Sequence, residues 1–411
     1  MLKKLLIIGF VWPEPQSSAA GSRMIQLISA FKSRDYIITF ASSSLKNDRS
    51  FSLDELGISQ KAIELNSSSF DKFVKKLNPD VVLFDRFMTE EQFGWRVEEQ
   101  CPKALRILDT EDLHCLRKGR EQSYMDGKPF NRYYLFNETA KREIASIYRC
   151  DLSLIISEVE MEILINQFKI NEELLYYLPF MLGQISQEQQ SILPNFEDRS
   201  HFIFIGNFHH QPNYSAVIYL KEQIWPKIRQ HLPEVEVHIY GAYANQKVNR
   251  LHDKKEGFLI KGYIENVNEV MCKARVCLVP LQFGAGLKGK MIDAMTNGTP
   301  CVTTEIGAEG LFGDMEPNGF IQNVAEKFAE SGIDLYINES GWNDKQKNGF
   351  KILNHRFNKK HFQKNFLDKL KNLQKQLEIH RLNNFTRSML MYHGLKSTKY
   401  MSKWIEEKNK S

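Results

Sequence analysis

Hydrophobic positions along the chain form short continuous runs that alternate with longer stretches of helical period. The runs are residues 4–10, 36–41, 80–84, 105–108 and 152–156 in a first series, and residues 202–205, 235–240, 258–260, 276–279 and 301–303 in a second. Continuous runs of branched aliphatic residues are typical of parallel strands that are buried on both faces. Their alternation with helices predicts two α/β units built on parallel sheets.

The two series are separated by residues 183–199, which are rich in Gln and Ser and poor in apolar periodicity. We interpret this stretch as a linker between an N-terminal domain, residues 1–182, and a second domain, residues 200–355. Residues 356–411 are expected to be a basic helical segment that ends in a short helix near residues 400–408. Ligands of doubly wound domains bind at the carboxyl ends of the strands, so a cleft between the domains is the expected site.

The composition agrees with this organisation. A chain of 411 residues with 42% hydrophobic and 26% charged residues is typical of a globular protein of two domains. Its six cysteines include no CxxC pair, which argues against a disulfide framework and against a zinc knuckle. The run LLIIGFVW at residues 5–12 is too short to span a bilayer and lacks a signal-peptide cleavage pattern, so we expect a cytoplasmic protein.

The sharpest candidate for a binding site is FGAGLKGKMIDAMTNGTP, residues 283–300. It places glycines between a predicted strand and a helical run, where backbone N–H groups and the helix dipole attract anions. Lys288 and Lys290 add positive charge. The segment also fits most of a Walker A loop, but Met291 stands where a hydroxyl must hold magnesium, which argues against a P-loop NTPase.

The same glycines, Gly284, Gly286 and Gly289, fit the dinucleotide pattern G-x-G-x-x-G, with Glu305 as a ribose-binding acid. This pattern leaves an NAD-dependent oxidoreductase open as an alternative. The match, however, lies deep in the second series of strands, whereas a dinucleotide fingerprint belongs to the first βα turn.

Five ordered segments resemble the donor-binding half of glycosyltransferase family 4. They are IGNFHHQPNYSA at residues 205–216, IYGAY at 239–243, GFLIKGYIENV at 257–267, LVPLQFGAGLKGKMIDAMTNGTPCVTT at 278–304 and IGAEGL at 306–311. The resemblance implies the GT-B fold, in which two Rossmann-like doubly wound domains face each other across a cleft and C-terminal helices pack back on the first domain. It also implies sugar transfer from a UDP- or GDP-sugar to an acceptor hydroxyl, with retention and without a metal or other cofactor.

The resemblance further implies a set of donor contacts. Lys290, with Lys288 beside it, would face the donor pyrophosphate, and Asp293 would hold the ribose hydroxyls in place of the family's second glutamate. The other expected donor-side residues are Gly206, Gly241, Tyr263, Ile264 and Gly286. Tyr263 and Ile264 match the loop that receives the base, although Tyr263 fits a core aromatic equally well.

The sequence departs from the family at two positions. Ala285 stands where the first of two paired glutamates is expected, and Asn207 stands where a basic residue often follows the first strand of this domain. A non-catalytic GT-B module that binds a nucleotide sugar or a glycan therefore remains an alternative to an enzyme.

Two segments of the first domain are candidates for the acceptor side. Residues 13–24 resemble the family's acceptor loop, and Gly21 and Arg23 are expected to contact a phosphate or sugar, the alternative being a capped helix with a solvated arginine. In LDTEDLHCLR, residues 108–117, His114 matches the histidine that reaches the transferring sugar, and we predict that it is catalytic together with Lys290.

The carboxylates Glu158 and Glu160 either line the cleft or lie at a solvated helix start. We expect that the adjacent residues His209 and His210 do not bind a metal ion.

Net charge is unevenly distributed along the chain. The total is +5, but residues 351–411 carry 15 Lys and Arg against four Asp and Glu, a net charge of +11, and the first 350 residues carry a net charge of −6. Nothing in the body of the protein therefore predicts a nucleic-acid partner. The expected partners are a nucleotide sugar and a glycan, lipid-linked or other hydroxyl acceptor. Lysines on solvated helix faces account for most of the excess positive charge of residues 351–411. We expect the rest of this charge to favour binding of an anionic acceptor or of the inner face of a membrane.

Overall fold

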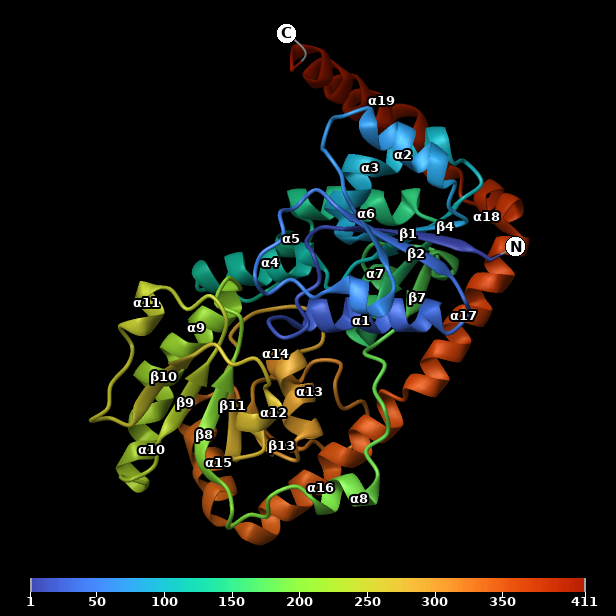
Figure 1. Ribbon diagram of the computed structural model, residues 1–411. Helices are drawn as coiled ribbons and strands as arrows, with labels where there is room; N and C mark the ends of the chain where they lie inside the picture. The colour runs from blue at the N-terminus through green and yellow to red at the C-terminus, as the bar shows by residue number, and fades with distance from the viewer. Residues whose placement is uncertain (1, 410–411) are drawn as a thin grey trace.

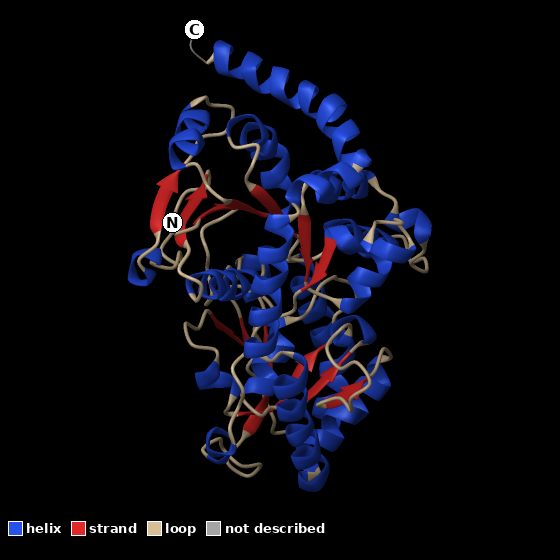
Figure 2. Ribbon diagram, turned by 90° about the vertical axis from the view of Figure 1, so that its right-hand side faces the viewer, coloured by secondary structure: helices blue, strands red, loops and turns tan. Residues whose placement is uncertain are grey.

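The computed structural model describes residues 2–409, with the backbone alone at residues 394–396. Its two parallel sheets lie in separate halves of the molecule, and the last helices run from the second half back to the first (Figure 1). Helices flank both sheets in the second view (Figure 2). The predicted fold class, two doubly wound α/β domains with returning C-terminal helices, is confirmed.

The first sheet has the strand order β3-β2-β1-β4-β5-β6-β7. Its strands are β1 Lys4–Gly9, β2 Ile37–Ser42, β3 Ser59–Ala62, β4 Val81–Asp85, β5 Leu105–Asp109, β6 Leu152–Ile155 and β7 Leu175–Tyr177. Side chains alternate between two buried faces: Leu6 and Ile8 enter one core, and Leu5 and Ile7 enter the other. Burial on both faces explains why these strands read as continuous apolar runs.

Seven α-helices connect these strands. They are α1 Ala19–Lys32, α2 Ser69–Leu77, α3 Arg86–Gln100, α4 His114–Met125, α5 Arg132–Leu135, α6 Glu138–Arg149 and α7 Glu158–Asn166, with 3₁₀ helices at Leu53–Leu56 and Glu172–Leu174. Helix α1 begins where the Ser18 hydroxyl accepts the backbone N–H of Gly21 at 3.1 Å. Met24, Leu27, Ile28 and Phe31 form its buried stripe.

The second sheet has the order β10-β9-β8-β11-β12-β13. Its strands are β8 Ser200–Ile205, β9 Val237–Tyr240, β10 Phe258–Gly262, β11 Ala274–Val279, β12 Cys301–Thr303 and β13 Gly319–Ile321. The helices of this half are α8 Gln187–Ser191, α9 Gln211–Tyr219, α10 Trp225–His231, α11 Gln246–Asn249, α12 Asn268–Met271, α13 Gly289–Thr296, α14 Glu305–Ala308, α15 Ala325–Ile337 and α16 Glu339–Arg356, with a π turn at Leu220–Ile224.

The chain then returns to the first domain through α17 Lys359–Lys375, α18 Leu377–Asn383 and α19 Phe385–Lys408. Helix α17 packs against α1, where Phe366 meets Phe31 edge-on with ring centroids 5.6 Å apart. Helix α19 packs against α3 and α6. The outgoing and returning segments are hydrogen-bonded side by side, because Leu182 donates to Phe357 O at 2.7 Å and accepts from Lys359 N–H at 2.8 Å.

The structure differs from the sequence prediction at three strands, which were not predicted, and at two helices. The strands β3, β7 and β13 have only three or four residues, and β3 (SQKA) is polar. Neither their length nor their apolar pattern therefore indicates a strand in the sequence. The linker contains the short helix α8, which is held by a capping box at Ser186 and Gln189. The last helix is much longer than predicted, since α19 starts at the Asn384 cap and continues for 24 residues.

Removing the Arg381 side chain should destabilise the whole protein, because Arg381 docks α18 onto the first domain. Its Nε and Nη2 each donate to the fully buried Asp151 carboxylate at 2.7 Å, and Nη2 also donates to Ala104 O. We expect Arg381→Ala to lower the free energy of unfolding by about 3 kcal/mol, as breaking a buried ion pair does. Chemical denaturation measures it.

Arg34→Ala is the matched control, because its pair with Asp368 is exposed on both sides and 3.6 Å long. It should cost less than about 1 kcal/mol. A cost for Arg381→Ala as small as that of Arg34→Ala would show that the buried contacts of Arg381 stabilise the protein no more than an exposed ion pair does.

Candidate active site

A cleft of about 1140 Å³ lies between the carboxyl edges of the two sheets. Its lining comes from the loops after β1, β4 and β5 of the first sheet, and after β8, β9, β10 and β11 of the second. In both sheets the strand order reverses at this place, between β1 and β4 and between β8 and β11. Such switch points are where open α/β sheets bind ligands.

Most of the residues predicted from the sequence line this cleft. They are His114, Gly206, Gly241, Tyr263, Ile264, Gly286, Lys288, Lys290 and Asp293. Gly21 and Arg23 are not among the lining residues. Glu305, the acid of the dinucleotide alternative, is exposed and also lies outside the lining.

The glycine loop between β11 and α13 is held in an unusual shape by its own residues. Gly284 and Gly286 have φ values of +152° and +66°, which side-chain-bearing residues rarely adopt. The Lys288 ammonium donates to Gly286 O at 2.5 Å and to Ala285 O at 3.2 Å. Burial lowers the pKa of Lys288, although the Glu309 carboxylate opposes this effect.

Lys290 and Asp293 lie one turn apart at the start of α13. The Lys290 ammonium is 2.6 Å from Asn213 Oδ1 and 4.2 Å from the centre of the Phe204 ring. Burial lowers the pKa of Lys290 to about 7 and raises the pKa of Asp293 to about 7. An anion placed at the N-terminus of α13 would favour the charged form of Lys290.

Gly206 and Gly241 are required by close packing beneath this pair. A Cβ at Gly206 would lie 2.9 Å from Lys290 Nζ and 2.8 Å from Asn213 Cγ, and a Cβ at Gly241 would lie 2.0 Å from Gly206 O. Any larger residue at either position would displace Lys290 or the β8 terminus. Sequence reasoning assigned these glycines to donor binding, and the structure shows that they make room for the side chains that line the cleft.

His114 is held firmly at the start of α4. Glu143, which is buried on α6, accepts the backbone N–H groups of His114 and Cys115 at 3.0 and 2.9 Å and so caps the helix. The ring Nδ1 is 3.1 Å from Asp112 O, and the ring packs edge-on against Phe87. Nδ1 therefore donates to the carbonyl, and among the described residues Nε2 has no hydrogen-bond partner, which leaves it available to a ligand.

The prediction for Arg23 is wrong. Its side chain is 1% exposed, and Nε and Nη2 donate to Asp109 at 2.8–3.2 Å while Nη1 donates to Leu178 O. Each of its three guanidinium nitrogens donates inside the first domain, and the side chain is not among the residues that line the cleft. Gly21 is likewise packed, since a Cβ there would lie 2.4 Å from Glu14 O.

Two residues that line the cleft were not among the site residues predicted from the sequence. Arg86 and Glu111 follow the neighbouring strands β4 and β5, and both adopt left-handed conformations with φ of +69° and +63°. Apart from a 3.6 Å ion pair between Arg86 and Asp85, neither side chain has a hydrogen-bonding partner in the described part of the chain. Burial raises the pKa of Glu111 well above its usual range. Polar residues with strained backbones of this kind cluster at ligand sites. Glu111 belongs to the polar run that follows β5, whereas no sequence pattern indicates Arg86.

One end of the cleft is closed by contacts from the first domain to the loops that follow β9 and β10. The Tyr243 hydroxyl donates to the Glu14 carboxylate at 2.9 Å, and Arg49 stacks on the rings of Tyr243 and Tyr263 at 4.3 and 4.6 Å. Tyr263 is thus partly exposed at a domain contact and is not a core residue.

The two adjacent histidines take different roles. His209 stacks on Tyr243 with ring centroids 4.1 Å apart, and His210 lines the cleft. Burial and the nearby Arg117 lower the pKa of His210 to about 4, so it is neutral at physiological pH. In the described residues no group of His, Cys, Asp and Glu is arranged to hold a metal ion.

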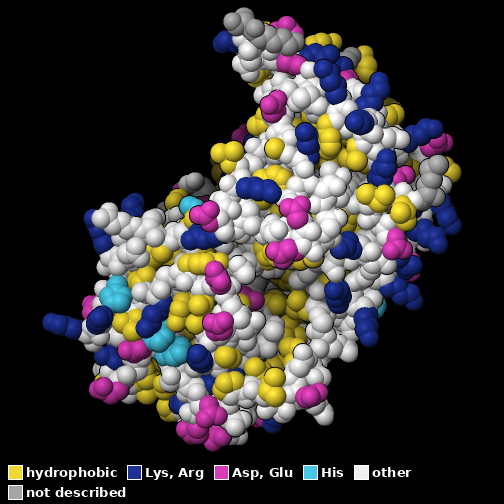
Figure 3. Space-filling model, viewed as in Figure 1, with side chains coloured by type: hydrophobic (Ala, Val, Ile, Leu, Met, Phe, Trp, Pro, Cys, Tyr) yellow, Lys and Arg dark blue, Asp and Glu magenta, His cyan; other side chains and the backbone are white. Residues whose placement is uncertain are grey.

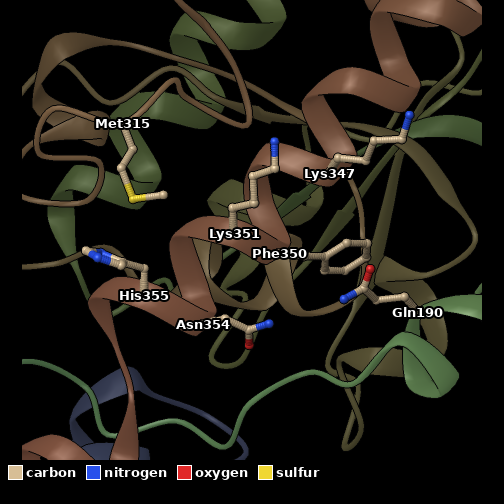
Figure 4. A pocket seen from close by; sticks show the side chains of 7 residues that line it. All are labelled: Gln190, Met315, Lys347, Phe350, Lys351, Asn354 and His355. Atoms are coloured by element: carbon tan, nitrogen blue, oxygen red, sulfur yellow. The ribbon is translucent and has the colours of Figure 1, made fainter.

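A smaller hollow of about 590 Å³ lies apart from the cleft (Figure 4). It is lined by Gln190 of α8, Met315, and five residues of α16: Lys347, Phe350, Lys351, Asn354 and His355. Asn354 there exchanges two hydrogen bonds with the backbone of Ile185 at 2.8 and 3.1 Å, which fixes the linker to α16. None of the predicted site residues lies in this hollow.

Residues 199–338 match the family described as glycosyl transferases group 1. This match covers the second sheet, the glycine loop and α13. A curated relative from Klebsiella pneumoniae, described as an uncharacterized 44.6 kDa protein in the cps region, is 25% identical over 165 residues. That alignment spans 38% of this chain and 42% of the relative.

Solved structures resemble the whole chain in fold. Anabaena HepE in complex with UDP and glucose has a TM-score of 0.68 at 12% identity and covers 90% of this chain and 100% of its own. Sucrose-phosphate synthase from Thermosynechococcus elongatus has a TM-score of 0.65 at 14% identity, covering 90% and 99%. S. aureus TarM has a TM-score of 0.68 at 11% identity, covering 90% and 99%. The protein has the GT-B fold.

Binding of a diphosphate at the N-terminus of α13 at pH 8.5 should be accompanied by the uptake of a proton by Lys290. In the ligand-free cleft the pKa of this ammonium is about 7, so it is neutral at pH 8.5, and a diphosphate beside it restores the charge. The affinity for a diphosphate should therefore be full below pH 7 and fall as the pH rises above it. Asp293, with a pKa of about 7, is already ionised at pH 8.5 and contributes little.

Isothermal titration calorimetry in buffers of different ionisation enthalpy measures this uptake. Lys290→Ala should abolish it, whereas Lys254→Ala, a change at an exposed lysine outside the cleft, should preserve it. A heat of binding that does not depend on the buffer would contradict the role of Lys290.

Proposed function

We propose that the protein is a glycosyltransferase that moves a sugar from a UDP- or GDP-sugar to an acceptor hydroxyl in the interdomain cleft. The observation that carries this proposal is the glycine loop that leads into α13, with Lys288 and Lys290 beside it and Asp293 one turn on, inside the segment that matches group 1 glycosyl transferases. HepE, which shares the fold, has been solved with UDP and glucose.

The donor half has the chemistry that a nucleotide diphosphate needs. The N-terminus of α13 has no side-chain cap among the described residues and offers backbone N–H groups to phosphate oxygens. Lys290 offers a positive charge, and burial makes that charge costly in the absence of an anion. Asp293 can accept hydrogen bonds from ribose hydroxyls. Tyr263 and Ile264 line the cleft, and we propose that they contact the base.

In the transfer, the bond between the anomeric carbon and the diphosphate oxygen breaks, and a bond to the acceptor oxygen forms. The acceptor's proton passes to the leaving diphosphate oxygen, so no separate base is consumed. We propose retention of configuration by this same-face route, with Lys290 and the α13 N-terminus stabilising the leaving charge without a metal or other cofactor. His114 Nε2 would contact the transferring sugar.

The acceptor would bind against the first-domain wall of the cleft. Arg86 supplies guanidinium donors, Glu111 supplies a carboxyl group of raised pKa, and the ring of Phe10 lies 5.3 Å from the Arg86 guanidinium. Donors, acceptors and an aromatic face together suit a sugar or another polyhydroxyl group. The cps region named for the Klebsiella relative agrees with a role in polysaccharide biosynthesis.

A second candidate is a module that binds a nucleotide sugar or a glycan without turnover. Ala285 favours it, because this residue lines the cleft and carries no carboxylate for the donor sugar. Turnover of a donor separates the two candidates.

The first experiment is a thermal-shift panel with UDP, GDP, ADP and their sugars, since a ligand at a hundred times its Kd stabilises by about 2.7 kcal/mol. Sugar transfer with the donor so identified should fall by two to three orders of magnitude in Lys290→Ala and by about a hundredfold in His114→Ala. Lys254→Ala should behave as the unmodified protein. Stabilisation by NADH alone would refute the proposal, and binding without turnover would favour the module.

We also propose that α18 and α19 rest on the anionic inner face of a membrane. Large apolar side chains of both helices are exposed: Ile379, Leu382, Phe385, Met389, Tyr392, Tyr400, Met401 and Trp404. Phe385, Met389 and Tyr392 share one helical face, opposite the buried Arg387. Basic and apolar side chains intermingle at this end of the molecule (Figure 3). No described helix is long and apolar enough to cross a bilayer.

Trp404 reports directly on this surface. It is 60% exposed, whereas Trp12, Trp95, Trp225 and Trp342 are at most 4% exposed. Vesicles containing phosphatidylglycerol should shift the tryptophan emission to the blue, and brominated lipid should quench it, because aromatic residues between lysines settle at a headgroup interface. Phosphatidylcholine vesicles should have a weaker effect. Trp404→Ser should remove the shift, and Tyr133→Ser, at an exposed aromatic of α5, should keep it. An unchanged spectrum with anionic vesicles would contradict membrane contact.

A further inference from the structure

A buried polar contact between the domains involves Glu160, a residue of the first turn of α7. This side chain is fully buried. Its Oε1 accepts two backbone N–H groups, from Leu113 at 3.0 Å and from Gly286 at 2.8 Å. Leu113 directly precedes His114 in the first domain, and Gly286 is in the glycine loop of the second domain. One oxygen atom therefore joins both halves of the candidate active site.

The surrounding packing leaves this contact little freedom. A Cβ at Gly286 would lie 2.8 Å from Asp112 Cβ and 3.7 Å from Ile156 Cγ2, so the glycine loop already touches the segment that carries His114. Arg120 of α4 adds a second attachment, because its Nη1 donates to Gly284 O at 2.8 Å. The first domain thus holds the glycine loop from both directions, at a carbonyl through Arg120 and at an N–H through Glu160.

We propose that Glu160 is the positioning residue that sets the glycine loop, and hence the bound diphosphate, in register with His114. Glu160 does not line the cleft, so it acts through Gly286 and Leu113 and contacts no substrate. This inference rests on the proposed function, to which it adds a residue from the opposite domain. It also gives a role to a carboxylate that the sequence suggested only as a cleft or surface residue.

The second oxygen of Glu160 explains which substitution preserves the contact. Oε2 is buried and has no hydrogen-bond partner among the described residues. Burial and the neighbouring Asp112 raise the pKa of Glu160 to about 8, so the group is largely uncharged at neutral pH and Oε1 can act as a carbonyl acceptor. Glutamine offers the same acceptor on a side chain of the same length, whereas alanine removes it and leaves two buried N–H groups unpaired.

Amide hydrogen exchange tests the contact without any substrate. In Glu160→Ala the amides of Leu113 and Gly286 should exchange about tenfold faster than in the unmodified protein, as expected for the loss of one hydrogen bond each. In Glu160→Gln both should stay protected. Glu158→Ala is the matched control, because Glu158 also bridges the domains, through Arg356 at 2.5 Å, but makes no hydrogen bond to the glycine loop. It should leave both amides protected.

Kinetics then test the positioning role. With the donor found by the thermal-shift panel, Glu160→Ala should lower kcat by about a hundredfold, the penalty of a misplacement near 1 Å. The Kd of UDP should stay close to its original value, since Lys290 and α13 are unchanged. Glu160→Gln should restore kcat. If Glu160→Ala does not fold, Glu160→Asp, which is too short to reach both N–H groups, takes its place.

The outcomes are distinct from those that decide the proposed function. Unchanged exchange of Leu113 and Gly286 in Glu160→Ala would overturn the inference, whatever reaction the protein catalyses. So would faster exchange without a fall in kcat, or an equal loss of kcat in Glu160→Gln. Absence of any sugar transfer by the unmodified protein, with exchange as expected, would instead refute the glycosyltransferase and leave Glu160 as a coupling between the domains.

Discussion

The two domains meet so closely that three glycines of the second domain have no room for a side chain. Besides Gly286 against Asp112, a Cβ at Gly289 would lie 2.6 Å from Ala19 Cβ, and a Cβ at Gly310 would lie 2.7 Å from Ser157 Oγ. The start of α13, the loop before α4 and the start of α7 are thereby brought to one place. The cleft takes its shape from these approaches, because they set the separation of the two sheet edges.

This closeness also determines the electrostatics of the cleft. Lys290 and Asp293 are buried, and burial brings both of their pKa values to about 7 in the absence of a ligand. Glu111 and His210, on opposite walls, are likewise shifted toward their uncharged forms by burial. A site of this kind gains charge at Lys290 when an anion enters, so affinity and protonation are linked.

Sequence reasoning found the parts of the site that local pattern encodes. The buried strands follow from apolar runs, the glycine loop and both lysines from motif spacing, and His114 from the family resemblance and its polar surroundings after a strand. The structure brings the glycine loop, the lysines and His114 to one cleft. The edge strands were missed, since three or four residues without an apolar run carry no signal. Arg23 was misassigned because the sequence does not show that β5 places Asp109 beneath α1. Glu143 and Glu160 act on helices distant in sequence, and such contacts exist only once the domains have formed.

The return of the chain to its starting domain bears on how the protein is made. The ribosome releases β1–β7 first, yet the face of that sheet under α1 is completed only by Phe366 and Leu370 of α17, and the buried Asp151 meets Arg381 only after α18 emerges. The second domain, encoded entirely in between, can finish folding earlier. The domain that is synthesised first is thus the last to be finished, and until translation ends its nascent form exposes an apolar surface that chaperones can bind.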